Sequence, residues 1–384
     1  MNRKIGTSAY YLVAILTAAL CVLMIPSVSV KFSSGHEVRG IAIAVDNSEV
    51  IRSNVSNIGY QTVTVKLLDK PYKGRIVDAS NILLGKLDQD NFYKTGDSLF
   101  VVFNPQPGPG QPAVRTVEKI RQGWIALLFA IFAGSLIFFG RKTGLRGLLS
   151  FIITLAVIFF FLIPALLKSV PPVIVSSVTI IFLTFIIMFL VAGISRRAIA
   201  ASAGTIAGLA FTLLITELFG GLLGLYGYTN PYSEVLLYSG HLGLNMRDIF
   251  TSSIVIGASG AAMDISMDVS TSMEEILHKR PDIGRKELIM SGFTIGRAVI
   301  GTMTTTLLLA YSGSYLTLLM LFQTLTTSPV RALNMKIVIA ELLRTVSGSL
   351  SLVLVAPLTA VLSGFLLMSE RRRIRSAVRS DDSV

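Results

Sequence analysis

Two acidic residues, Asp264 and Asp268, interrupt a stretch that is otherwise apolar or small, and they are the residues best placed to do chemistry. A spacing of four residues puts both carboxylates on one face of a helix. Because a carboxylate at the centre of a bilayer costs about 2.5–3.5 kcal/mol, such a residue should face protein or water. There it can bind a cation or carry a proton. The alternative is a helix that ends sooner and leaves both acids as surface charges at the cytoplasmic interface.

Small residues lie directly before the two acids, with Gly257 and Gly260 close together and Met263 next to Asp264. Small side chains let a second helix approach closely. Glycines also loosen a helix, which frees main-chain carbonyls to join an ion site. The run from 257 to 264 therefore predicts close helix packing beside the acids.

Further charged groups lie inside apolar stretches. Glu217 is either a site residue that faces the acidic helix or a group near the outer end that reaches water. Glu341 and Arg344 have the spacing of a same-face pair. Such a pair is more often structural than functional, so both readings stay open.

Arg297 opens a segment rich in threonine that includes Gly301 and Thr302. These hydroxyls could line a polar path. In membrane helices, however, threonine more often bonds the carbonyl one turn earlier or packs between helices. We therefore expect Arg297, Gly301 and Thr302 to serve packing.

An intramembrane protease is a further alternative, because Gly-Ala-Ser-Gly at 257–260 matches the Gly-x-Ser-Gly of rhomboid-type serine proteases. That chemistry needs a base from another helix, and no histidine lies in a predicted span. An aspartyl protease needs carboxylates on separate helices, whereas Asp264 and Asp268 share one. We therefore predict no enzymatic activity and no catalytic residue.

The composition is that of a polytopic membrane protein. Of the 384 residues 52% are hydrophobic and only 15% are charged, and the mean hydropathy is +0.69. The net charge of +12 comes from short basic clusters between apolar runs, so it indicates membrane orientation rather than nucleic-acid binding. The single Cys21 and the scattered His36, His241 and His278 predict neither a disulfide nor a metal site. No phosphate loop or dinucleotide fingerprint occurs, so we predict no cofactor.

Seven stretches after residue 121 approach the length of about 20 apolar residues that a spanning helix needs. They are 124–140, 148–167, 173–194, 198–223, 249–267, 298–322 and 346–368. Residues 1–30 add a membrane anchor or a signal segment, of which we favour the anchor. We therefore predict an all-α polytopic bundle of about seven to eight transmembrane helices, with its membrane domain at 122–368 and a basic cytoplasmic tail at 369–384.

Residues 31–121 form a second domain of a different kind. β-Branched residues with partial alternation predict strands at 38–45, 60–68 and 99–103, separated by turn signals. Regular short strands favour a small barrel, OB-like or SH3-like, and the Pro/Gly-dense segment 104–112 is a linker. With the basic clusters on one side, both termini are cytoplasmic and residues 31–121 are extracytoplasmic. Trp124 fits an anchor at the membrane surface.

Three segments of this chain resemble the YibE/F-like family of bacterial multi-pass membrane proteins. They are Gly-Ala-Ser-Gly-Ala-Ala-Met-Asp at 257–264, the segment 296–311 that opens with Gly-Arg-Ala-Val-Ile-Gly-Thr-Met, and the segment 348–360 that opens with Gly-Ser-Leu-Ser. The order of anchor, external β-rich segment and membrane domain is similar as well. The resemblance implies the bacterial cytoplasmic membrane and marks Met263-Asp264 and Gly301 to Met303 as motif positions. It implies a small polar residue where this chain has Asp268, and it supplies no substrate.

Two functions follow from these observations. The first is a transporter or channel-like protein in which Asp264 titrates or binds a cation, with the bilayer and a small solute or ion as partners. The second is a non-transporting scaffold or envelope sensor whose acids only stabilise helix packing. A cavity that reaches Asp264 favours the first, and a dry, closed bundle favours the second. Homo- and hetero-oligomers both stay open.

Overall fold

A computed structural model of the chain describes residues 37–87, 89–103, 113–324 and 328–381, with the backbone alone for 370–381. It divides into two compact units, Met1–Phe139 and Gly140–Val384. The predicted anchor or signal segment, 1–30, and the predicted linker, 104–112, lie outside the described residues.

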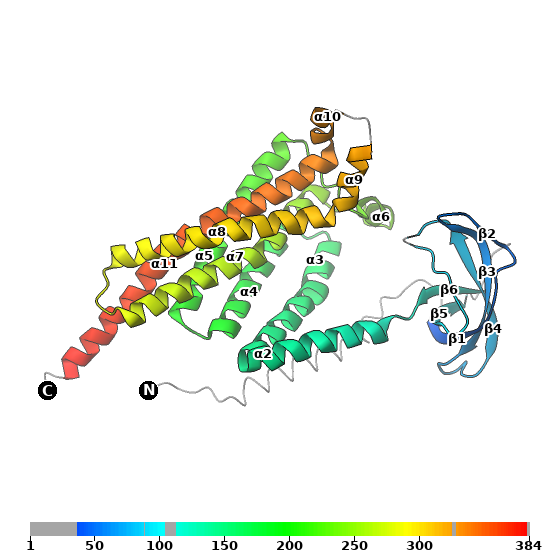
Figure 1. The fold of residues 1–384 in the computed structure, drawn as a ribbon, viewed down its shortest axis with the longest axis horizontal. Helices are drawn as coiled ribbons and strands as arrows, with labels where there is room; N and C mark the ends of the chain where they lie inside the picture. The colour runs from blue at the N-terminus through cyan, green and yellow to red at the C-terminus, as the bar shows by residue number, and fades with distance from the viewer. Residues whose placement is uncertain (1–36, 88, 104–112, 325–327, 382–384) are drawn as a thin grey trace. The chain divides into compact units, whose positions relative to one another are not determined.

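Six strands of the first unit form one sheet: β1 (Glu37–Asp46), β2 (Val50–Arg52), β3 (Asn57–Leu67), β4 (Ile76–Leu84), β5 (Ser98–Phe103) and β6 (Val114–Lys119). Their order is β1-β5-β6-β4-β3-β2, and an additional pairing of β1 with β3 closes the sheet into a small barrel (Figure 1). All pairings are antiparallel except that of β4 with β6. When the short β2 is set aside, the strands follow the order first, second, third, fifth, fourth around the ring. This connectivity favours the OB-like alternative over the SH3-like one.

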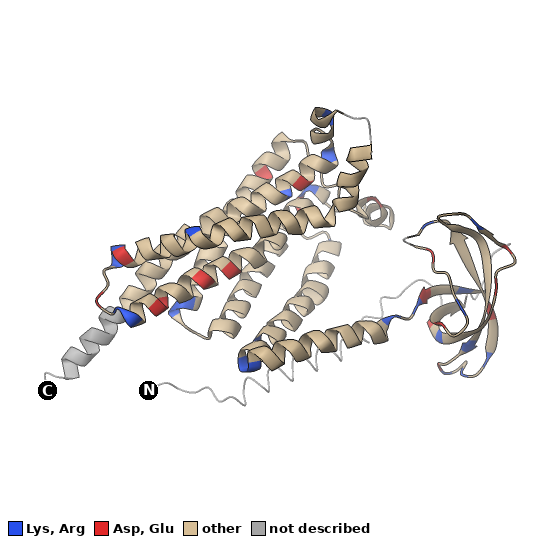
Figure 2. Ribbon diagram, in the orientation of Figure 1, with Lys and Arg blue, Asp and Glu red and all other residues tan. Residues whose placement is uncertain are grey.

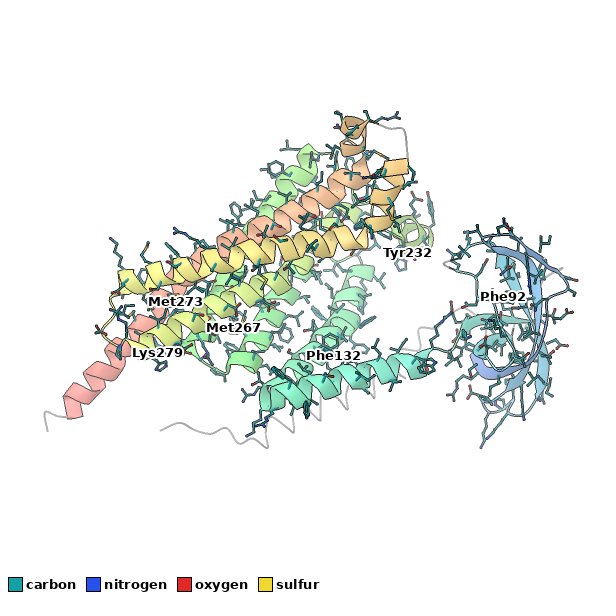
Figure 3. The ribbon with its side chains drawn as sticks, viewed as in Figure 1. Phe92, Phe132, Tyr232, Met267, Met273 and Lys279 are labelled. Carbon is teal, nitrogen blue, oxygen red and sulfur yellow. The ribbon has the colours of Figure 1, made fainter. Side chains whose placement is uncertain are left out.

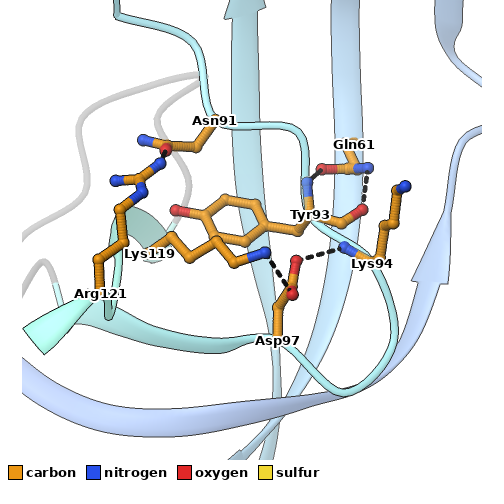
Figure 4. Close-up of polar contacts among 7 residues, drawn as sticks. All are labelled: Gln61, Asn91, Tyr93, Lys94, Asp97, Lys119 and Arg121. Carbon is orange, nitrogen blue, oxygen red and sulfur yellow. Dashed lines mark hydrogen bonds and ion pairs between the residues drawn. The ribbon is translucent and has the colours of Figure 1, made fainter. Parts of the chain in front are cut away.

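The barrel interior holds a buried amide as well as apolar side chains. Gln61 is fully buried, and its Nε2 donates to Asn47 Oδ1 (2.7 Å) and to the carbonyl of Tyr93 (3.0 Å). Its Oε1 accepts from Asn81 Nδ2 at 3.0 Å. The same oxygen accepts from the Tyr93 backbone N–H, also at 3.0 Å, and Figure 4 shows the contacts between Gln61 and Tyr93. Burial raises the pKa of the Tyr93 phenol to about 12, so this ring stays neutral in the core. Through its two hydrogen bonds to the Tyr93 backbone, Gln61 holds the irregular segment before β5 against the strands.

Asp97, the last residue before β5, carries an ion pair. Its carboxylate accepts a hydrogen bond from Lys119 Nζ and another from the Lys94 backbone N–H at 2.9 Å (Figure 4). Burial alone raises the pKa of Asp97, but these two hydrogen bonds and the attraction to both ammonium groups outweigh it and hold the pKa below its ordinary value. Since the folded-state pKa is the lower one, the pair stabilises the barrel above the unfolded pKa and loses that effect as the pH falls through the folded pKa.

We therefore expect Asp97→Asn to weaken the barrel at neutral pH, and the difference from the unsubstituted chain to shrink as the pH falls. Asparagine keeps an acceptor for the Lys94 N–H but loses the charge that Lys119 needs. Hydrogen exchange of β5 and β6 as a function of pH measures this effect. A difference that stays constant over the whole acid range contradicts the ion-pair account.

The remaining elements are helical. They are α2 (Gln122–Val157), the π-helix η1 (Ile158–Leu162), α3 (Ile163–Leu167), α4 (Pro172–Ala192), α5 (Arg196–Leu222), α6 (Ser233–Tyr238), α7 (Met246–Lys279), α8 (Arg285–Ser314), α9 (Leu316–Thr324), α10 (Pro329–Leu333) and α11 (Lys336–Asp381). Among the described residues six helices are long and apolar enough to cross a membrane: Gln122–Leu167, α4, α5, α7, α8 and Lys336–Ser369. The predicted mostly helical membrane architecture is confirmed at this level.

The predicted number of seven spans within 122–368 is not confirmed. The stretches 124–140 and 148–167 fall within Gln122–Leu167, which counts as one of the six, but this run consists of two helices that meet at a kink at Arg141 (φ 47°, ψ −121°). Several helix ends also differ from the predicted ones, because α7 continues from 267 to Lys279, α8 begins at Arg285 instead of 298, and α11 begins at Lys336 instead of 346.

Helix α11 packs against α5, α7 and α8. Glycines spaced by four residues face it from two sides, Gly204 and Gly208 on α5 and Gly292 and Gly296 on α8. A Cβ added to Gly204 would lie 2.9 Å from Thr359 Cα, and one added to Gly296 would lie 2.9 Å from the Cβ of Ala356 on α11. Real side chains do not fit at these distances, so the small residues set the close approach of the helices.

Buried hydroxyls fix how α7 is rotated in this packing. Ser266 Oγ lies 2.8 Å from Thr205 Oγ1 of α5 and 3.1 Å from Thr359 Oγ1 of α11, and all three side chains are fully buried. The core side of α7 also carries Ile265 and Val269, both fully buried. The opposite side of α7, where the two acids lie, therefore points away from α5 and α11.

Candidate functional site

The exposed stripe of α7 contains Gly257, Gly260, Asp264 and Asp268, which recur at helical spacing. Helix α7 begins at Met246, where Asn245 caps it by accepting from the Asp248 N–H, and runs without interruption to Lys279 (Figure 3). Helix α7 therefore continues past both acids, and the part of the predicted alternative in which the helix ends sooner is wrong. At 1.5 Å per residue Asp264 lies about 27 Å from one end of α7 and about 22 Å from the other.

Asp264 and Asp268 are both exposed, and neither has a hydrogen-bond or ion-pair partner among the described residues. Figure 2 shows acidic positions within α7 that lie away from its ends. The two carboxylates also lie close enough along the helix to repel each other when both are charged. An unpaired carboxylate pair in the middle of a membrane-length helix is unfavourable toward lipid and favourable toward water, a cation or a proton.

A cavity of about 320 Å³ lies beside the stripe, between α2-η1, α4 and α7. From α7 it is lined by Ile256, Gly257, Ser259, Gly260 and Met263. Asp264 follows directly on Met263 and is itself exposed. The volume is at the small end of the range of about 300–1,000 Å³ that is usual for ligand pockets.

The cavity walls are mostly aliphatic. Its three hydroxyls already donate to their own helices: Thr154 to the carbonyl of Ser150 (2.8 Å), Thr179 to that of Val175 (2.7 Å) and Ser259 to that of Ile256 (2.7 Å). They can accept a further hydrogen bond but do not form a charged site. The cavity therefore suits a small molecule with a mostly apolar surface, and neither Asp264 nor Asp268 is part of its lining.

Ser259 is also the serine of the protease alternative. Its hydroxyl is engaged by the Ile256 carbonyl. His278 lies nineteen residues further along the same helix, a separation of about 28 Å. His241 lies in the loop between α6 and α7 and is not part of α7. Along α7 no histidine therefore lies near Ser259.

Glu217 of α5 is held in an ion pair. Its carboxylate lies 3.2 Å from Arg247 Nη2, and the same guanidinium donates to the Glu217 carbonyl at 3.3 Å. The pair joins the C-terminal part of α5 to the first turn of α7. Glu217 therefore connects two helices and does not meet Asp264.

Glu341 and Arg344 form the predicted same-face pair, with 3.4 Å between Glu341 Oε1 and Arg344 Nε. Each side chain is only 16% exposed. Arg344 also donates to Asn230 Oδ1 at 3.0 Å and lies over the ring of Phe250. The pair thus ties α11 to α7 and to the segment before α6, which is a structural arrangement.

Arg297, Gly301 and Thr302 lie on an exposed side of α8. Thr302 Oγ1 donates to the carbonyl of Val299 at 3.0 Å, as expected for a threonine in a membrane helix. Arg297 lines a second cavity, of about 340 Å³, between α8 and α11 near Pro357. Gly296 precedes Arg297, and a Cβ added to it would lie 3.9 Å from Cγ2 of Val269, the residue after Asp268. Arg297 and Asp268 are therefore at a similar height along the neighbouring helices α8 and α7. They form no ion pair in the structure.

Met263 and the glycines of the stripe take part in packing to different degrees. Met263 packs against the cluster of Met188, Ala198 and Ala201. A Cβ on Gly257 would lie 2.9 Å from Tyr311 Oη, whereas one on Gly260 would meet nothing within 4 Å. Gly257 thus makes room for a tyrosine of α8, and Gly260 leaves the cavity wall open.

The sequence-based candidates omitted several residues that matter here. Arg247 and Asn230 complete the two ion-pair clusters, and Thr205 and Thr359 orient α7 through Ser266. For Thr205 and Thr359 the available signal is a polar residue inside an apolar segment, whereas Arg247 and Asn230 have no such signal. Among the described residues no group of three or more His, Cys, Asp and Glu side chains is placed to hold a metal ion.

Comparisons with known families give two matches. A family model described as YibE/F-like protein matches residues 128–369, and one described as YibE/F family N-terminal domain matches residues 41–113. No curated protein and no solved structure matches the chain.

Proposed function

We propose that this chain, which belongs to the YibE/F-like family, is a transporter or channel-like protein that uses Asp264 to bind a small cation or a proton. Family membership and the membrane-length helices make it a multi-pass membrane protein. The proposed activity moves a solute or ion and performs no catalysis.

One contrast among the four acids supports this proposal. Glu217 and Glu341 each have an arginine partner, whereas Asp264 and Asp268 have no partner among the described residues. An arginine partner compensates the charge of Glu217 and of Glu341, whereas an unpaired acid in a membrane helix is costly unless it faces water or a ligand. The mostly aliphatic cavity has space for a small solute, and its lining includes Gly260 and Met263, which precede Asp264 on α7, although Asp264 itself is not part of that lining.

We also propose an orientation for the chain. The basic clusters around Arg141, Arg196 and Lys279 fall at helix ends that share one side in the predicted topology. By the positive-inside rule that side is the cytoplasm, with both termini there and residues 31–121 outside the cytoplasmic membrane. The lipid bilayer is then the main partner, and the oligomeric state is open.

The test is flux through the purified protein in liposomes, followed with entrapped pyranine for protons and with labelled tetraethylammonium for an organic cation. Asp264→Asn should lower the flux by about tenfold or more, because the amide cannot carry the charge that balances the cation. Asp282→Asn, in the exposed turn between α7 and α8, is the matched control and should leave the flux unchanged. Equal fluxes in Asp264→Asn and the control would rule out the proposed role of Asp264.

A non-transporting scaffold or envelope sensor is the second candidate, and the two arginine-paired acids favour it. In that case the unsubstituted protein moves neither probe, and Asp264→Asn changes only the thermal stability of the membrane unit. The liposome assay therefore separates the two functions in one experiment.

A further inference from the structure

Exposed aliphatic side chains gather at one end of the barrel. Ile51 of β2 is paired with Ile58 of β3, and Ile58 is paired with Leu84 of β4, so the three form a row across adjacent strands. They are 71%, 48% and 61% exposed, and Val55 and Leu87 in the adjoining turns are 74% and 70% exposed. We call these five residues the end patch. Contiguous apolar surface of this kind usually marks a contact with a partner or a membrane.

The sheet register shows that this is the end at which the chain leaves the barrel toward the membrane. Strands β4 and β6 are parallel, with Ser80 opposite Arg115. Four residues further on, β4 ends at Leu84 and β6 ends at Lys119. The last residue of β6 is therefore at the same end of the barrel as the end patch.

The connection from that end to the membrane is very short. Only Ile120 and Arg121 separate β6 from α2, a distance of at most about 11 Å when fully extended. The exposed apolar surface of α2 begins at once, with Trp124 77% and Ile125 64% exposed. Trp124 is the kind of residue that settles at the membrane surface. The end patch thus belongs to a part of the chain that cannot move far from the bilayer.

The residues beside the patch suit lipid headgroups. Arg52 follows Ile51 directly and Lys86 precedes Leu87, and both are exposed. Asp90 is engaged by the backbone N–H of Lys86 at 2.9 Å. Aliphatic side chains flanked by cations are the usual composition of a surface that enters the boundary between headgroups and acyl chains.

We propose that the end patch inserts into the surface of the bilayer next to α2, so that the barrel rests on the membrane with its β2-β3-β4 end. The occupant of the patch is therefore lipid. This contact is independent of the proposed transport, and it gives the barrel a fixed side toward the membrane. Insertion removes the patch from water, which stabilises it in proportion to the buried apolar area.

The strand β4 offers a matched pair of positions for the test. Leu84 and Ile76 are both aliphatic, both on the outer face of β4, and 61% and 60% exposed. They lie eight residues apart, which is about 26 Å along a strand, so they mark opposite ends of the barrel. The full chain has one cysteine, Cys21, and Cys21→Ser provides the background for single-cysteine variants.

Leu84→Cys and Ile76→Cys are labelled with the fluorophore NBD in the full chain and reconstituted into liposomes of phosphatidylcholine and phosphatidylglycerol. At position 84 we expect blue-shifted emission, several-fold stronger quenching by nitroxide lipids than at position 76, and protection from aqueous iodide. At position 76 iodide should quench freely and nitroxide lipids should not.

Two results overturn the proposal. Equal iodide quenching at the two positions means that the end patch stands in water. Protection of position 84 from iodide without quenching by nitroxide lipids means that protein, and not lipid, covers the patch. Both outcomes leave the flux assay unaffected, so failure here is distinguishable from failure of the proposed transport.

Discussion

Replacing Gly204 by valine is expected to destabilise the membrane unit by about 3 kcal/mol, one of the two largest effects of a single substitution predicted here. A Cβ at this position would lie 2.9 Å from the Cα of Thr359, which is backbone and cannot turn aside as a flexible side chain can. Helices α5 and α11 must then separate, and overpacking of this kind costs about 1–3 kcal/mol or more. The Thr359–Ser266 hydrogen bond at 3.1 Å also depends on this approach.

Thermal unfolding of the purified protein in detergent measures the effect. The matched control is Gly313→Val near the end of α8, where an added Cβ meets nothing within 4 Å. The control should change stability by less than about 0.5 kcal/mol. If both variants melt together with the unsubstituted chain, the close approach of α5 and α11 does not depend on Gly204.

Gln61→Leu is expected to have a comparable effect on the barrel, with a loss of at least about 3 kcal/mol. Leucine fills a similar volume but removes four hydrogen bonds, two to Tyr93, one to Asn47 and one to Asn81. Each buried donor or acceptor that is left unpaired costs about 1–3 kcal/mol. The segment before β5 loses its attachment first, because Tyr93 is held through both its N–H and its carbonyl.

Hydrogen exchange of the segment 89–97 in the full chain measures this loss. Thr62→Val changes the next residue of the same strand, whose side chain is exposed, and should leave the exchange nearly unchanged. Slow exchange of Tyr93 in Gln61→Leu would contradict the role given to the buried amide.

The two units differ in how far their folds could be predicted. Strands β1, β3 and β5 show β-branched alternation and are close to the predicted stretches. Strand β4 was not predicted, because Asp78, Ser80 and Asn81 interrupt its apolar pattern. Asn81 is nevertheless buried, since it donates to Gln61 and to the Asn91 carbonyl. Closure of the barrel through β1 and β3 is a long-range pairing that no local pattern contains.

The candidate site divides in the same way. The sequence shows that Asp264 and Asp268 share a helical face and that Glu341 and Arg344 are spaced for a pair. It does not show that Glu217 meets Arg247 thirty residues away, because that contact requires α5 and α7 to lie side by side. It also does not show which acids stay unpaired, and the proposed function depends on that distinction.

From the sequence alone we could predict a multi-pass membrane protein, its division into a β-rich and a membrane part, and the approximate position of most spans. These properties follow from composition and local periodicity, because each membrane helix must satisfy its own backbone within one segment. The tertiary structure alone decided the strand order of the barrel, the rotation of α7 that exposes its two acids, and the arginine partners of the other two. Those features come from contacts between residues far apart in the chain, and only packing brings such residues together.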